Sequence, residues 1–246
     1  MLYALIFVAG LWAGMQNALA GGGSFVTLPA LILSGMSPLA ANITSTVALF
    51  PAQVSTGWAG RKLVSGTPNL SFRALLLVSL LGGALGALLL LNTPSTVFAR
   101  LVPWLVLFAT SVFAWGSFFR KPNAPGMNLG PGATAVTQFV IAIYGGYFGG
   151  GIGFLMLAAL TIAGMATRHA GATKNVLAAV MNTSALAIFV LSPEVHWPQA
   201  VVLSIGATLG GVAGAMALHR VNEKLLRIAI VALGVALTLG LFLRPL

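Results

Sequence analysis

Two glycine triplets, each inside an apolar segment and each followed by a small polar cluster, are the features of this sequence most suited to chemistry. The triplets are Gly21–Gly23 and Gly149–Gly151, and a polar cluster follows about twenty residues after each. A helix that restarts behind such a break begins with backbone N–H groups that have no intrahelical partner. Those groups and the positive end of the helix dipole attract an anion. The pattern therefore predicts an anion site between two helix starts, at Ser24 and Gly153.

The polar residues near the triplets supply hydroxyl and amide groups and one ammonium group. Without a carboxylate beside them, such groups suit a small oxyanion, and Lys174 would offset its charge. The alternative for Lys174 is that it extends its ammonium to the cytoplasmic interface, because it lies only one to two turns into its predicted helix. The predicted substrate ligands are Gly21, Gly22, Gly23, Ser24, Asn42, Thr44, Ser45, Gln53, Gly149, Gly150, Gly151, Thr173, Lys174, Asn175 and Asn182.

Glycines in membrane helices also serve close helix packing, which is the alternative for the triplets. The duplication and the short apolar stretch behind each triplet favour a broken helix instead. The glycines within Leu81–Ala87 and Leu209–Ala215 are different, because they lie in mid-helix without polar neighbours. For these two segments we predict close packing.

The composition is that of a protein that crosses a membrane several times. Of the 246 residues, 59% are hydrophobic and 6% are charged, with a mean hydropathy of +1.02. A soluble domain has roughly a quarter charged residues. The net charge of +10 is assigned to cytoplasmic loops by the positive-inside rule, and no nucleic-acid partner is expected. No small-residue cleavage site or basic leader is seen near the first apolar segment, so no removable signal peptide is expected.

Several chemistries lack the residues they need. The chain has no cysteine and no aspartate, and its two glutamates, Glu194 and Glu223, fall in predicted loops. A carboxylate-based cation site or proton relay inside the membrane is therefore not expected. The isolated His196 and His219 do not make a metal site. We expect no metal, no cofactor and no catalytic residue.

The apolar segments predict an all-α fold of two repeats, at 1–119 and 133–246, joined by a linker at 120–132. The stretch 24–35 would span about 18 Å, which is too short for a hydrocarbon core of about 30 Å. Each repeat is therefore expected to begin with a glycine-broken hairpin and to continue with three membrane helices. The hairpins are predicted at 2–35 and 133–165, and the helices at 38–60, 74–92, 96–119, 170–192, 199–219 and 225–243.

Matched blocks support the duplication. Leu81–Ala87 matches Leu209–Ala215 at an offset of 128 residues, and Gln53 matches Asn182 at an offset of 129. If each broken element enters and leaves on one side of the membrane, the second repeat is inverted relative to the first. Nine of the eleven basic residues considered then fall on one face of the membrane. Positive-inside counting then places both termini outside the cell.

The chain resembles the TauE/SafE family of membrane transporters, also called the sulfite exporter family. The resemblance rests on Gly21–Gly23 with Pro29, on Ala41–Ser45, on Gly149–Gly151 and on Ala170–Asn175, and it spans nearly the whole chain. It implies transport of sulfite, sulfoacetate or another sulfonate across the bacterial cytoplasmic membrane.

Together these features predict a secondary transporter, not an enzyme, that moves a small anion by alternating access between its repeats. The expected partners are the anion and the lipid bilayer, with a proton as candidate coupling ion and a homodimer as candidate assembly. A passive anion channel with the same pocket is the first alternative. An intramembrane lipid-phosphate enzyme and a structural partner subunit are weaker alternatives, since the enzyme would need carboxylates or a histidine constellation in the membrane.

Overall fold

The computed structural model of the protein describes residues 2–19, 22–119, 129–217 and 223–243. Within these ranges the regular structure is helical, apart from one isolated bridge between Thr67 and Leu70. The all-α prediction is confirmed. Gly21 and residues 120–128 of the predicted linker lie outside the described residues. The elements are α1 (Leu2–Leu19), α2 (Ser24–Leu33), α3 (Pro38–Gly60), a 3₁₀ turn (Arg61–Leu63), α4 (Phe72–Leu91), α5 (Ser95–Ala114) with a π-helical continuation (Trp115–Phe119), α6 (Pro131–Tyr147), α7 (Ile152–Ile162), α8 (Thr167–Phe189), α9 (Trp197–Ala217) and α10 (Glu223–Leu243).

The short helices α2 and α7 end in the same way. Each is followed by a glycine in the left-handed region, Gly35 at φ 93° and Gly164 at φ 95°. The next residue then donates its N–H back into the helix, from Met36 to the Leu31 carbonyl oxygen in α2 and from Met165 to the corresponding carbonyl oxygen in α7. A glycine is favoured at such a C-terminus because it has no Cβ to clash. These two glycines lie 129 residues apart.

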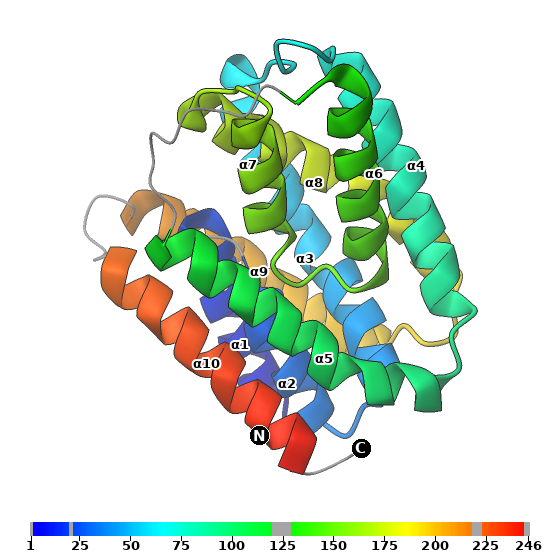
Figure 1. Cartoon of the computed structure of the whole chain (residues 1–246). Helices are drawn as coiled ribbons and strands as arrows, with labels where there is room; N and C mark the ends of the chain where they lie inside the picture. The colour runs from blue at the N-terminus through cyan, green and yellow to red at the C-terminus, as the bar shows by residue number, and fades with distance from the viewer. Residues whose placement is uncertain (1, 20–21, 120–128, 218–222, 244–246) are drawn as a thin grey trace.

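The glycine breaks form hairpins as predicted. Figure 1 shows α7 beside α6, returning to the end of the bundle at which α6 begins. The other short helix, α2, likewise contacts α1, from which the first break separates it. α3 occupies the predicted range 38–60, with Ser37 accepting a hydrogen bond from the Ala40 N–H at its start.

The two halves of the chain interlock through close helix contacts. α1 packs along α9, and α4 packs along α6, so the first helix of each half lies on the fourth helix of the other. The glycines of Leu81–Ala87 and Leu209–Ala215 make these contacts tight. A Cβ on Gly86 would lie 2.1 Å from the Ile143 carbonyl oxygen, and a Cβ on Gly210 would lie 2.0 Å from the Leu11 carbonyl oxygen. The predicted packing role is confirmed, while the inversion of the second repeat stays a prediction.

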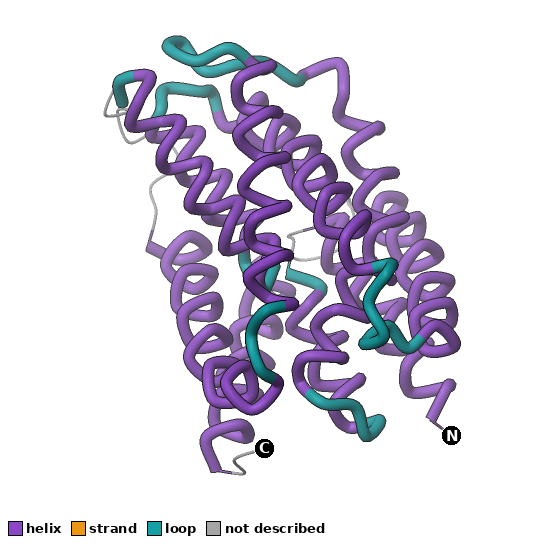
Figure 2. The backbone as a smooth tube through the Cα atoms, turned by 90° about the vertical axis from the view of Figure 1, so that its right-hand side faces the viewer, coloured by secondary structure: helices purple, strands orange, loops and turns teal. Residues whose placement is uncertain are grey.

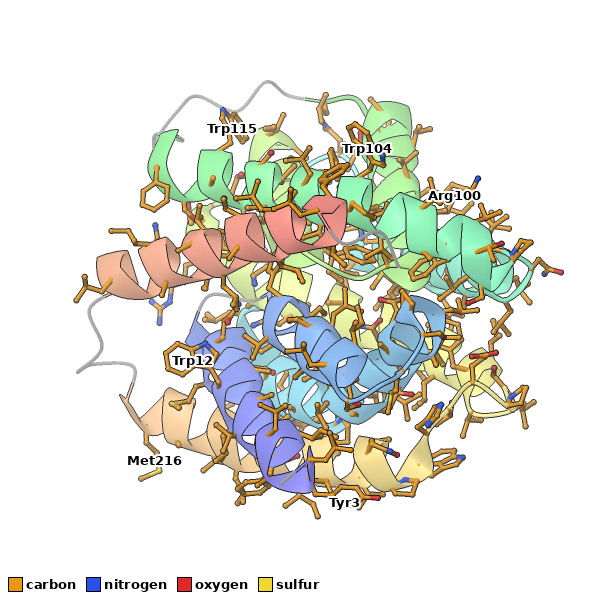
Figure 3. All side chains as sticks on the ribbon, turned by 90° about the horizontal axis from the view of Figure 1, so that it is seen from below. Tyr3, Trp12, Arg100, Trp104, Trp115 and Met216 are labelled. Atoms are coloured by element: carbon orange, nitrogen blue, oxygen red, sulfur yellow. The ribbon has the colours of Figure 1, made fainter. Side chains whose placement is uncertain are left out.

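The outer surface of the bundle is apolar. Trp104, Trp115 and Met216 lie on this surface in Figure 3 and are more than half exposed. A continuous apolar surface of this kind is stable in lipid and not in water. Among the described residues, the helices at Phe72–Leu91 and Ser95–Phe118 are long and apolar enough to cross a membrane by length and composition.

The bundle has two ends of different charge. One, which we call the basic end, gathers the α3–α4 connection with Arg61 and Lys62, the start of α8, and the start of α10. A hydrogen bond between His169 Nδ1 and the Leu63 carbonyl oxygen (2.9 Å) joins α8 to the α3–α4 connection, and one from Arg227 to the Ser117 carbonyl oxygen (3.3 Å) joins the start of α10 to the end of α5. At the opposite end, α1 begins and α10 ends (Figures 1 and 2).

Candidate functional site

A cavity of about 60 Å³ lies between the two glycine breaks. It is large enough for a few water-sized groups. Its walls come from both breaks, from the second half of α3 and from the first half of α8. The lining residues are Asn17, Gly22, Ser24, Gln53, Thr56, Gly149, Ile152, Gly153, Lys174, Asn175 and Ala178.

The start of α7 presents backbone donors to this cavity. Gly149 and Gly151 have φ of +79° and +75°, which lets the chain turn sharply between α6 and α7. The N–H groups of Phe154 and Leu155 both donate to the Gly151 carbonyl oxygen. Those of Ile152 and Gly153 have no acceptor among the described residues, as expected for the first turn of a helix.

Each break is held by a side chain from the helix before it. Gln16 donates through Nε2 to the Gly22 carbonyl oxygen (2.8 Å), and the Tyr144 hydroxyl donates to the Gly150 carbonyl oxygen (2.9 Å). The two donors lie 128 residues apart, as do the two glycines. The same kind of hydrogen bond, which we call the brace, therefore occurs in both halves with different side chains. It directs the carbonyl oxygens of Gly22 and Gly150 toward side-chain donors of the protein.

Two of the three amide side chains that line the cavity have their oxygens occupied. Asn17 Oδ1 accepts the Gly23 N–H at 2.7 Å, and Gln53 Oε1 accepts a hydrogen bond from Asn182. Both amides therefore retain N–H groups as their remaining polar contribution to the cavity. Gln53 and Asn182 are the residues that the sequence matched at an offset of 129, and here they bond to each other across the contact of α3 and α8.

Lys174 brings a positive charge to the same place. A Cβ on Gly153 would lie 3.2 Å from Lys174 Nζ, so the ammonium faces the first turn of α7. Lys174 lines the cavity and is half-buried. Among the described residues it has no acidic partner within ion-pair distance. Lys174 thus lies at the cavity, and its depth relative to the membrane interface stays a prediction.

Four predicted ligands lie away from the cavity. Asn42 donates to the Tyr147 carbonyl oxygen (3.1 Å), and Ser45 shares a buried hydrogen bond of 2.6 Å with Thr27. Thr44 and Thr173 have hydroxyls that bond to the backbone of a loop from the other half.

These two threonines act as matched clamps. The Thr173 hydroxyl donates to the Ser65 carbonyl oxygen and accepts from the Ser65 N–H, both at 3.1 Å. The Thr44 hydroxyl donates to the Glu194 carbonyl oxygen (3.4 Å) and accepts from the His196 N–H (3.1 Å). The first clamp lies at the basic end and the second holds the α8–α9 connection.

The remaining predicted ligands divide between the cavity and its surroundings. Gly23, Gly150 and Gly151 belong to the breaks but do not line the cavity, and Asn182 lies behind Gln53. The predicted ligands that line it are Gly22, Ser24, Gln53, Gly149, Lys174 and Asn175.

Five lining residues were not among the predicted ligands: Asn17, Thr56, Ile152, Gly153 and Ala178, of which Gly153 was predicted only as a helix start. Asn17 carried a usable signal, because it is a polar residue in an otherwise apolar segment just before a glycine triplet. Ile152 and Ala178 carried none, since one contributes a backbone N–H and the other an apolar wall.

The arrangement offers hydrogen-bond donors and one ammonium, which is the inventory that binds an anion. Among the described residues no group of three or more His, Cys, Asp or Glu side chains is placed to hold a metal ion. The donors and the ammonium at this cavity thus match an anionic ligand.

Comparison with known proteins gives consistent results. The protein-family model described as "Sulfite exporter TauE/SafE" matches residues 6–241. The chain is 31% identical over 255 residues to "Probable membrane transporter protein ORF9" of Sinorhizobium sp., covering 99% of this chain and 94% of that protein. It is 29% identical over 243 residues to a "Probable membrane transporter protein" of Haemophilus influenzae, covering 96% and 93%. It is 28% identical over 235 residues to "Probable membrane transporter protein YfcA" of Escherichia coli K12, covering 94% and 86%.

Proposed function

This chain belongs to the sulfite exporter TauE/SafE family, and we propose that it is a secondary transporter of a small sulfur-containing anion. The proposed substrate is sulfite, sulfoacetate or another sulfonate, moved across the bacterial cytoplasmic membrane by alternating access. The relatives are named as membrane transporter proteins, which supports transport rather than catalysis.

One observation carries the proposal. In the cavity between the breaks, the Asn17 and Gln53 amide oxygens are already occupied, and the free backbone groups at the start of α7 are N–H donors. Lys174 adds a positive charge without an acidic partner among the described residues. These N–H donors and the uncompensated ammonium favour an oxyanion over a cation.

The position of the cavity along the bundle suggests which state the structure represents. Its α3 and α8 residues lie in the halves of those helices that lead to the basic end, such as Thr56 and Lys174. In the other direction nearly every residue of α3 from Leu39 to Leu49 is buried. We take this conformation to be the one open toward the basic end and closed toward the opposite end.

By the positive-inside rule, the basic end is proposed to face the cytoplasm, with both termini outside. In this arrangement the described conformation is inward-facing. The clamps made by Thr44 and Thr173 then lie toward opposite sides of the membrane.

The proposal is tested by thermal unfolding of the purified protein with sulfite, sulfoacetate, taurine, sulfate, phosphate or acetate. A ligand at about 100 times its dissociation constant stabilises the folded state by about 2.7 kcal/mol. We expect a rise in Tm with sulfite or one sulfonate and a much smaller rise in a Lys174→Gln variant. The same Tm in every anion, at concentrations up to tens of millimolar, would contradict an anion site here.

A further inference from the structure

A second concave surface lies on the outer side of the contact between α3 and α8. It is an apolar groove of about 280 Å³, with Val54, Gly57 and Trp58 on one wall and Val176, Ala179 and Val180 on the other. We call it the α3–α8 groove. It is separate from the anion cavity, which is lined by other residues of the same helices, Thr56 and Ala178 for example.

Small residues create this groove. A Cβ on Gly57 would lie 3.4 Å from the Asn175 carbonyl oxygen and 3.7 Å from Ala179 Cβ, so the two helices approach closely at that level. Larger neighbours remain exposed at the rim, with Val54 at 43% and Trp58 at 66%. The result is a shallow apolar channel on the lipid-facing surface.

One end of the groove carries a fixed positive charge. Arg61 follows α3 at the basic end, and its guanidinium carbon lies 4.1 Å from the centre of the Trp58 ring. Its Nη1 donates to the Trp58 carbonyl oxygen at 2.9 Å. Both contacts hold the guanidinium at the groove, and it is exposed there. A guanidinium retains further N–H donors in this position and matches the geometry of a phosphate.

We propose that the α3–α8 groove binds one anionic phospholipid, with an acyl chain along the apolar channel and the phosphate on Arg61. The apolar walls match the chain, and the guanidinium at the level of the basic end matches the headgroup. A second copy of this chain fits less well. Two parallel copies paired through this groove would bring Arg61 close to its own counterpart, with like charges facing each other.

The proposal rests on this surface and not on the proposed transport, so each can fail alone. It is tested by native mass spectrometry and thermal unfolding of delipidated protein in neutral detergent. The probes are phosphatidylglycerol, phosphatidylcholine with the same acyl chains, and inorganic phosphate. We expect tighter binding and a larger rise in Tm with phosphatidylglycerol, and no rise with phosphate alone.

Variants separate the two parts of the site. Arg61→Gln should reduce the preference for phosphatidylglycerol about fivefold, because one basic residue near a membrane surface contributes about 1 kcal/mol. Arg61→Lys should retain most of the preference. Ala179→Leu should weaken binding of both lipids by filling the groove. Arg100→Gln, an exposed arginine near the opposite end, is the matched control and should change nothing.

Three results would overturn the proposal. The first is equal binding of the two lipids to the unaltered protein. The second is an equal loss in Arg100→Gln and Arg61→Gln, which would indicate a general surface charge effect. The third is a dimer that Ala179→Leu dissociates, which would assign the groove to a second copy.

Discussion

Replacement of Lys174 by glutamine removes the one charge in the cavity. It leaves a polar side chain of nearly the same length. The ammonium lies 3.2 Å from the position of a Cβ on Gly153. Opposite charges about 4 Å apart attract by about 4 kcal/mol at an effective dielectric constant near 20, which is the attraction for an oxyanion placed between the first turn of α7 and the ammonium. Part of this is offset because both charges lose water.

We therefore expect Lys174→Gln to weaken anion binding by about 2–3 kcal/mol, or about 30- to 150-fold. The assay is calorimetric or thermal-shift titration of the anion that stabilises the unaltered protein. Stability without ligand should stay the same or rise, because Lys174 is half-buried and has no acidic partner among the described residues.

The matched control is Arg73→Gln, an exposed arginine at the basic end, which should bind within twofold of the unaltered protein. Lys174→Arg should keep part of the affinity, since it keeps the charge. A dissociation constant for Lys174→Gln within threefold of the unaltered value, in a protein that is still folded, would refute the assignment of the ammonium to the ligand.

Further predictions concern stability, measured as unfolding in detergent. Gly86→Ala should cost about 3 kcal/mol, because its Cβ would lie 2.1 Å from a carbonyl oxygen of α6. Gly171→Ala, where no atom lies within 4 Å of the Cβ, should instead stabilise the protein by about 0.5–1 kcal/mol. Similar effects of Gly86→Ala and Gly171→Ala would contradict the close-packing role of Gly86. Thr44→Val and Thr173→Val each remove two hydrogen bonds and should each lower the free energy of unfolding by about 1–3 kcal/mol. The two losses should add in the double variant because the clamps are far apart, and strong non-additivity would argue against separate clamps. Gly151→Ala should cost about 1–2 kcal/mol at its φ of +75°, and an unchanged Tm would show that the break tolerates a side chain.

The sequence predicts much of this fold because its signals are local. Long apolar segments define the helices, Ser37 with Pro38 begins α3, and the glycine triplets separate a long helix from a short one twice. The close-packing role of the glycines around Gly86 and Gly210 was also predictable, since they have no polar neighbours.

The candidate site was predicted only in part because a polar residue in an apolar chain has two uses. It either binds a ligand or satisfies the backbone of another segment, and its position in the sequence does not distinguish them. Thr44 and Thr173 are of the second kind, and their partners lie 150 and 108 residues away. The common brace of the breaks by Gln16 and Tyr144 was missed because the two side chains are chemically unlike.

The measurement that tests the transport account most directly is counterflow in proteoliposomes. Vesicles are loaded with unlabelled sulfite or with the sulfonate that stabilises the protein, and diluted into a trace of the same anion in labelled form. A carrier with alternating access should accumulate the label transiently above its equilibrium level, and Lys174→Gln should lose this accumulation. A label that only rises to equilibrium, without overshoot, would contradict alternating access and favour a passive anion channel.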